Sequence, residues 1–159
     1  MRLVIGADHA GYVLKSAVVR HLEQAGHAVN DIGTFSEAPV DYPPICADVA
    51  RRVVRGEGDA GVVIGGSGQG EAIAANKVHG ARAALCHDEY TARLARKHND
   101  ANVLSMGARL VATELALDIL DVFTATAFEG GRHVARINEL AAIEADESAG
   151  AGGAPHPAT

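Results

Sequence analysis

An apolar segment that runs into a glycine-rich loop decides the fold of this chain. Residues 60–71 read AGVVIGGSGQGE. Residues 60–64 are apolar throughout, which is typical of a central strand in a parallel sheet, because helices cover both of its faces. The loop from Gly65 to Gly70 joins this strand to a short helix predicted over residues 71–77. A buried strand, a glycine-rich turn and a helix, in that order, indicate an α/β fold.

The same alternation of strands and helices continues on both sides of this segment. Pro43 and Pro44 suit the first turn of a helix, and Asp88 and Thr113 are predicted N-caps of later helices. The pattern predicts one three-layer α/β/α Rossmann-like domain with a five-stranded parallel sheet and an extra C-terminal helix. The other predicted strands are residues 3–6, 28–32, 81–86 and 102–106, and the later helices are residues 88–98, 113–128 and 132–143.

Composition and charge set the domain organisation and the classes of partner. The chain has 159 residues, of which 48% are hydrophobic, so one packed domain is expected. We expect this domain to span residues 1–143, and residues 144–159, rich in Ala, Gly, Ser and Pro, to be disordered. The net charge of −6 argues against nonspecific nucleic-acid binding. The sequence shows neither a signal peptide nor a membrane-spanning run, so a cytoplasmic protein without a membrane partner is expected.

The loop at Gly65–Gly70 is a predicted anion site. Four of its six residues are glycine, which lets backbone N–H groups converge on a ligand, and the helix N-terminus adds partial positive charge. The alternative is a merely tight turn, although a turn seldom needs four glycines. The loop lacks the Gly-Lys-Ser/Thr ending of a P-loop. Its glycine spacing, after the third strand, does not match a dinucleotide fingerprint.

Glu71 follows the loop directly and changes the kind of anion that the loop suits. A carboxylate beside a bound phosphate would repel it. Proton abstraction next to a carbonyl, in contrast, needs both a base and nearby N–H donors for the enediolate that forms. The sequence therefore predicts an oxyanion hole with Glu71 as its base. The alternative is that Glu71 only complements the dipole of its helix.

Basic side chains that suit a phosphate group occur in three parts of the chain. Arg132 and Arg136 are four residues apart on one helix face, Arg109 follows the fifth strand, and His9 follows the first. The alternative for each arginine is a solvated surface charge. His98 ends the fourth helix, where it is either a functional group or a partly buried, hydrogen-bonded histidine.

A metal site is not predicted. The candidate ligands His87, Asp88, His98 and Asp100 lie close together in the sequence. They lack the compact spacing of a His-Glu-x-x-His zinc motif, so their pattern does not specify a metal site.

Four motifs along the chain have a common interpretation. They are DHAG at residues 8–11, VDYP at 40–43, the loop at 65–70 followed by IAANK at 73–77, and HNDAN at 98–102. Together they resemble the ribose-5-phosphate isomerase type B family, which also includes the galactose-6-phosphate and allose-6-phosphate isomerases. The motifs occur in the family's order, and the resemblance covers about residues 1–143.

The resemblance implies an aldose–ketose isomerase that interconverts ribose 5-phosphate and ribulose 5-phosphate through an enediolate. Glu71 would move a proton between C2 and C1, and His98 would donate the proton that opens the furanose ring, assisted by Asp8. Family members are dimers or larger, with sites shared between subunits, and no metal or organic cofactor is implied. The other implied substrate-binding residues are Asn99 for the sugar, His9, Arg109, Arg132 and Arg136 for the phosphate, and Gly66, Ser67, Gly68, Gln69 and Gly70 for the enediolate oxygens.

One position separates this chain from many members of that family. Those members place a cysteine base where this chain has Gly65. The chain resembles instead the branch, familiar from actinobacteria, whose base is a glutamate at the position of Glu71. Two alternatives stay open. One is an isomerase of another sugar, such as allose 6-phosphate, galactose 6-phosphate or an unphosphorylated sugar. The other is a noncatalytic phosphate- or nucleotide-binding module, which would need neither Glu71 nor His98.

Overall fold

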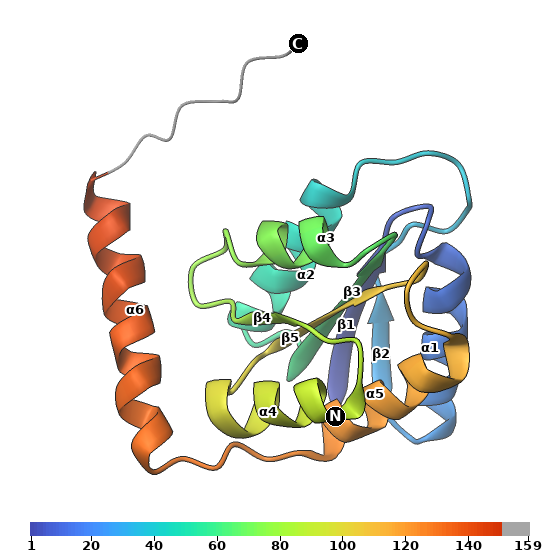
Figure 1. Ribbon diagram of the computed structural model, residues 1–159. Helices are drawn as coiled ribbons and strands as arrows, with labels where there is room; N and C mark the ends of the chain where they lie inside the picture. Colours follow the sequence, from blue (N-terminus) through green and yellow to red (C-terminus); the bar gives the residue numbers. More distant parts are fainter. Residues whose placement is uncertain (151–159) are drawn as a thin grey trace.

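The computed structural model of the chain describes residues 1–150, and its centre is a parallel sheet with the strand order β2-β1-β3-β5-β4 (Figure 1). The fold is the single three-layer α/β/α domain predicted from the sequence. No helix within the described residues is long and apolar enough to cross a membrane. The strands are β1 (Arg2–Ala7), β2 (Ala28–Asp31), β3 (Ala60–Gly65), β4 (Ala83–Leu85) and β5 (Val103–Gly107). The helices are α1 (Tyr12–Gln24), α2 (Tyr42–Val54), α3 (Gln69–Ala75), α4 (Glu89–Asn99), α5 (Thr113–Ala125) and α6 (Arg132–Gly150).

Helices cover both faces of the sheet. Helices α1, α4 and α5 lie on one face, and α2 and α3 lie on the other (Figure 1). Side chains of a strand point alternately to the two faces. Leu3 and Ile5 of β1 accordingly join the core under α1, α4 and α5, whereas Val4 joins the core under α2. Every residue of β3 is buried, as predicted for a central strand.

The final helix, α6, stands beside the rest of the domain and continues beyond its predicted end at residue 143 (Figure 1). Alanine and glutamate favour helix in this segment. The hydroxyl of Ser148 also donates to the carbonyl oxygen of Glu144 at 2.6 Å. The expectation of disorder from residue 144 onward is therefore wrong for residues 144–150. The remainder of that predicted segment, residues 151–159, lies outside the described residues.

The two predicted helix caps have different outcomes. Asp88 caps α4 as predicted, since its side chain accepts a backbone N–H from the first turn at 2.7 Å. Thr113 is not a cap, because Ala112 occupies the N-cap position of α5 and Thr113 is already helical. The same helix ends at Ala125 rather than at residue 128, because Thr126 adopts an extended conformation.

The direction of the strands places the predicted site residues at two edges of the sheet. The loops after β1, β3 and β5 meet at the carboxyl edge, where ligands of such sheets bind. Helix α4 connects parallel strands and so runs in the opposite direction. Its last turn, with His98, therefore lies at the amino edge, close to the start of β5 at Val103. Glu71, in the first turn of α3, follows the carboxyl end of β3. One copy of the domain thus keeps His98 and Glu71 apart.

Candidate active site

The glycine-rich loop packs tightly against the end of β5. Gly68 has a φ of +78°, a left-handed conformation that favours glycine. A Cβ on Gly68 would lie 2.8 Å from the carbonyl carbon of Met106, and one on Gly107 would lie 2.6 Å from the carbonyl of Ser67. The hydroxyl of Ser105 donates to the carbonyl oxygen of Gly68 at 2.6 Å. These contacts hold the loop at the N-terminus of α3, where the first N–H groups have no acceptor within the helix.

The carboxylate of Glu71 occupies the space above Gly65. A Cβ on residue 65 would lie 1.8 Å from Oε1 of Glu71, so this position of the carboxylate requires glycine there. Glu71 is only 4% exposed. Burial raises the pKa of its carboxyl, the backbone N–H groups of Glu71 and Gly68 oppose that shift, and the charge of Asp8 adds to it. A carboxyl with a raised pKa is suited to accepting a proton from carbon.

A second carboxyl group and a thiol lie next to Glu71. Asp8 is 7% exposed and accepts a hydrogen bond from the backbone N–H of Gly11 at 3.0 Å. Cys46, which is fully buried on α2, has its pKa raised to about 12 by burial and by the charges of Glu71 and Asp8. This thiol stays protonated near neutral pH and is not a base. Glu71 and Asp8 are therefore the carboxyl groups that this site offers for accepting a proton.

A cavity of about 360 Å³ opens in front of these groups. Tyr42 approaches the loop so closely that a Cβ on Gly70 would lie 2.5 Å from its hydroxyl oxygen. The guanidinium of Arg109 packs over Gly66, with Cζ 3.4 Å from the position of a Cβ there. The cavity is thus walled by two carboxyl groups, one cation and the loop backbone. Its lining residues are Asp8, Tyr42, Gly66, Ser67, Gly70, Glu71, Arg109 and Leu110.

His9 lies beside this cavity, after β1. Its Nδ1 accepts a hydrogen bond from the backbone N–H of Val40 at 3.3 Å. A neutral histidine that accepts at Nδ1 carries its hydrogen at Nε2. The structure therefore leaves His9 an N–H that can donate to an anion.

The remaining predicted residues form a separate cluster at the amino edge of the sheet, between α4 and α6. His98 and Asn99 end α4, and Arg132 and Arg136 lie on the first turns of α6. They surround a second cavity of about 360 Å³, whose lining residues are His98, Asn99, Arg132, His133, Arg136, Ile137 and Leu140. The predicted site is therefore divided between two places in one chain.

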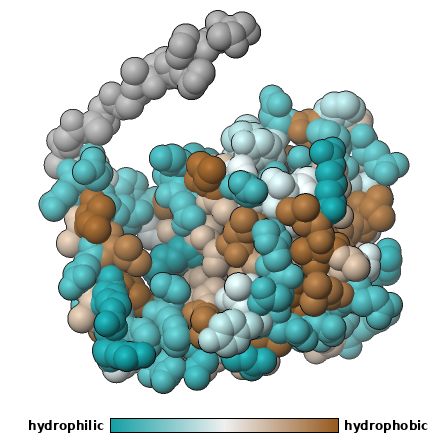
Figure 2. Space-filling view, in the orientation of Figure 1, coloured by the Kyte–Doolittle hydropathy of each residue, from teal (hydrophilic) through white to brown (hydrophobic). Residues whose placement is uncertain are grey.

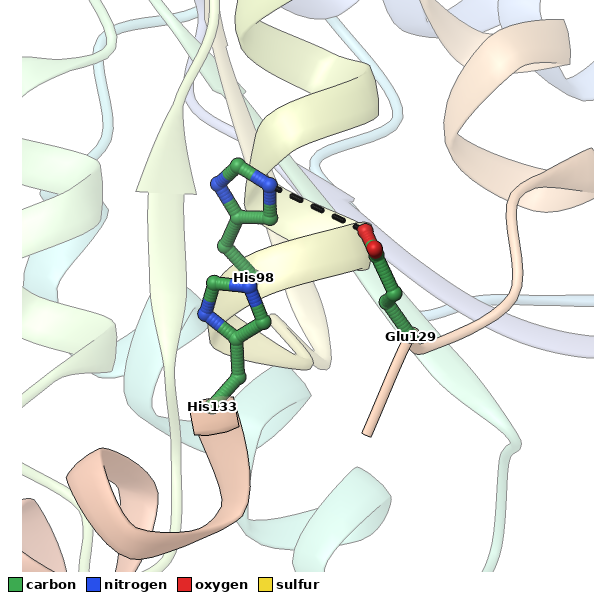
Figure 3. A group of neighbouring side chains, drawn as sticks. All are labelled: His98, Glu129 and His133. Atoms are coloured by element: carbon green, nitrogen blue, oxygen red, sulfur yellow. Dashed lines mark ion pairs between the residues drawn. The ribbon is translucent and has the colours of Figure 1, made fainter. Parts of the chain in front are cut away.

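His98 has two close neighbours, His133 and Glu129 (Figure 3). The ring of His133 stacks on that of His98, with centroids 4.3 Å apart and planes within 9° of parallel. Oε2 of Glu129 lies 3.9 Å from Nε2 of His98. Burial, then the charges of His98 and Arg132, lower the pKa of His133, which favours the neutral form of its ring.

The ligand atoms of His98, Glu129 and His133 lie within 4.8 Å of one another, close enough to raise the question of a metal ion. Imidazole lone pairs lie in the plane of the ring, so two stacked rings do not direct them to one point. Lys97, which pairs with Glu129 at 3.2 Å, and Arg132 add positive charge. This geometry does not suit a metal.

Two of the four metal-ligand candidates from the sequence, Asp88 and Asp100, make other contacts. Asp88 caps α4. Asp100 pairs with Arg82 at 3.1 Å and with Arg96 at 3.0 Å. Neither carboxylate is arranged around a common point with His98.

Comparison with known proteins identifies the family. The model of the Ribose/Galactose Isomerase family matches residues 3–140, and the chain belongs to this family. Ribose-5-phosphate isomerase B of Mycobacterium leprae is 49% identical over 146 residues, which cover 91% of this chain and 90% of that protein.

Solved structures agree with this assignment. A ribose-5-phosphate isomerase B from Clostridium thermocellum superposes with a TM-score of 0.91 at 47% identity, covering 92% of this chain and 99% of that one. The enzyme from Mycoplasma genitalium, solved with bound ribulose 5-phosphate, superposes with a TM-score of 0.87 at 39% identity, covering 92% and 97% of the two chains.

Proposed function

We propose that this protein interconverts ribose 5-phosphate and ribulose 5-phosphate, with Glu71 as the base and His98 as the acid that opens the sugar ring. The observation that carries the proposal is the buried Glu71 carboxyl facing a glycine-rich loop at the carboxyl edge of the sheet. Membership of the Ribose/Galactose Isomerase family supports it. So does the ribulose 5-phosphate bound to the related Mycoplasma genitalium enzyme.

The proton transfer between carbons is assigned to Glu71. Its carboxylate removes the proton from C2 of the open aldose, and the electron pair moves onto the carbonyl oxygen at C1 to give an enediolate. N–H groups of residues 66–70, with the hydroxyl of Ser67, stabilise the negative oxygen. The hydroxyl proton at C2 moves to the oxygen at C1, and the same carboxyl returns its proton to C1 as the carbonyl forms at C2. These transfers give the ketose without any net gain or loss of protons.

Ring opening precedes that transfer. His98 gives a proton to the ring oxygen as the bond between that oxygen and C1 breaks, and the C1 hydroxyl loses its proton to the carboxylate of Asp8. Asn99 binds a sugar hydroxyl in this arrangement. The phosphate is held by His9 and Arg109 on one side and by Arg132 and Arg136 on the other, since planar guanidinium groups donate in pairs to phosphate oxygens.

These roles require two copies of the chain. Glu71 and His98 lie at opposite edges of the sheet, so we infer a dimer, or a dimer of dimers, in which one copy supplies the Glu71 cavity and the other supplies His98, Asn99, Arg132 and Arg136.

A surface on this chain is suited to such pairing. β4 forms an edge of the sheet, next to a largely apolar cavity of about 530 Å³ that reaches Leu140 of α6. Figure 2 shows hydrophobic residues on α6 and in the hollow beside it. Leu140 is 49% exposed and Ile143 is 59% exposed in the single chain. A second copy would cover this surface.

The proposed reaction is tested by measuring ketose formation on a panel of aldose phosphates that includes ribose, allose and galactose phosphates. We expect turnover of ribose 5-phosphate. Turnover of only a six-carbon member would reassign the substrate, and no turnover of any member would favour a noncatalytic phosphate-binding module. Glu71→Gln should bind substrate but lose exchange of the C2 proton with solvent. Retained exchange would place the base elsewhere.

A further inference from the structure

Glu129 is held against the end of α4 by its own backbone. Its N–H donates to the carbonyl oxygen of Lys97 at 3.0 Å. Its side chain pairs with Nζ of Lys97 at 3.2 Å, and Oε2 lies 3.9 Å from Nε2 of His98. Nearby, the guanidinium of Arg96 donates to the carbonyl oxygen of Thr126 at 3.3 Å. The segment between α5 and α6 is thus tied to α4 at two points, and the carboxylate has a defined place beside the edge of the His98 ring (Figure 3).

The face of the His98 ring is held separately. His133 stacks on it with the planes within 9° of parallel. His133 is 8% exposed, so its own position is restricted by packing. The imidazole of His98 therefore has a carboxylate at its edge and a second flat ring stacked on its face. Such contacts limit rotation about the side-chain bonds of His98.

Several positive charges also lie close to His98. Lys97 lies on the same helix, and Arg132 and Arg136 project from α6 into the same cluster. The charges of both arginines lower the pKa of the neighbouring His133, and the charge of Glu129 raises it. Glu129 is the carboxylate that offsets these cations where His98 must hold and release a proton.

We propose that Glu129 is a positioning residue for His98, required for ring opening but not for the proton transfer between C2 and C1. The inference rests on the proposed function, because His98 has the role of ring-opening acid there. Glu129 itself need not contact the sugar. The Glu129 carboxylate lies beside the edge of the imidazole, orients the ring and balances the positive charge around it. Glu71 transfers the proton between carbons in the other half of the site.

The two steps can be measured separately because the two substrates differ in ring formation. Ribose 5-phosphate is mainly a furanose and must open. Ribulose 5-phosphate carries its phosphate on the oxygen that would close a five-membered ring, so it stays open. Exchange of its C1 proton with D₂O needs Glu71 and the glycine-rich loop but no ring-opening acid. Net conversion of ribose 5-phosphate needs both steps.

We expect Glu129→Gln to slow net conversion of ribose 5-phosphate by about tenfold, a part of the 10²–10⁴ that a general acid contributes. Exchange at C1 of ribulose 5-phosphate should stay within about twofold of wild type. Glu129→Asp, which keeps the charge, should recover part of the lost rate. The matched control is Glu139→Gln, which removes an exposed carboxylate of α6 and keeps Glu129 and its pair with Lys97. It should leave both readouts within about twofold of wild type.

A double variant tests the route of the effect. If Glu129 acts through His98, adding Glu129→Gln to His98→Asn should cause no further loss of net conversion. Unchanged conversion in Glu129→Gln, or an equal loss of conversion and exchange, would overturn the inference. A wild-type enzyme that exchanges no proton and converts no ribose 5-phosphate would instead overturn the proposed function, and this inference with it.

Discussion

Replacing Gly65 with alanine should disable Glu71 without removing any functional group. A Cβ on residue 65 would lie 1.8 Å from Oε1 of Glu71 and 2.2 Å from its Cδ. Because non-bonded atoms do not approach a Cβ within about 3.0 Å, the carboxylate must move away by more than about 1 Å. A misplacement of that size costs about 100-fold in rate, which corresponds to about 2.7 kcal/mol of activation free energy.

The assay is steady-state formation of ribulose 5-phosphate by Gly65→Ala. We expect kcat to fall by about 100-fold with a smaller change in KM, because the phosphate-binding groups stay in place. Gly66→Ala is the matched comparison. Its Cβ would meet Arg109 at 3.4 Å, an ordinary contact, so its loss of activity should be much smaller.

Stability measurements separate the clash from other effects of the substitution. Gly65→Ala should lower the melting temperature. Adding Glu71→Ala should recover part of that loss, since the clashing carboxylate is gone, while activity stays absent. A Gly65→Ala enzyme with wild-type kcat would refute the reasoning, because Glu71 would then act from a position that the structure does not show.

Three further predictions concern stability. The pKa of Glu71 is raised in the folded protein, so its contribution to stability is present at low pH and is lost as pH rises through that pKa. Glu71→Gln should therefore raise the melting temperature more at pH 7 than at pH 4, and a constant difference would contradict this. Lys15 is 1% exposed and pairs with Asp31, so Asp31→Asn should cost about 3–5 kcal/mol of unfolding free energy by leaving a buried ammonium group unpaired. Denaturant unfolding would measure that loss, and a loss below about 1 kcal/mol would show that the pair contributes little. Glu144 accepts the backbone N–H of Gly80 at 2.9 Å, so Glu144→Ala should lower the unfolding free energy by about 1 kcal/mol, measured in the same way, and no loss would show that the contact does not anchor α6.

The sheet and one half of the site follow from local sequence patterns. The uninterrupted apolar run of β3 predicts its central position, and the glycine loop with Glu71 predicts the cavity at the carboxyl edge. The strand prediction is confirmed, and the loop and Glu71 line a cavity at that edge, because burial of a strand and the conformation of a glycine turn depend on residues close together in the chain.

The rest of the site depends on contacts between distant segments. Tyr42 enters the cavity from α2, and Glu129 and His133 reach His98 from beyond α5. Tyr42 lies in the VDYP motif that carries the family resemblance, which was a usable signal. Nothing local marks Glu129, because an acidic residue before two glycines is ordinary. The length of α6 was underestimated for a related reason, since a segment of Ala, Glu and Ser is polar enough to resemble a tail and still forms a helix.

Mixing two impaired variants tests the central claim, that Glu71 and His98 act together from different copies of the chain. Glu71→Gln and His98→Asn should each retain only a small residual activity. Unfolded together in equal amounts and refolded, they should form mixed dimers in which one of the two sites has both residues intact. Random pairing then predicts about one quarter of wild-type activity. Activity no higher than that of the separate variants would contradict the claim.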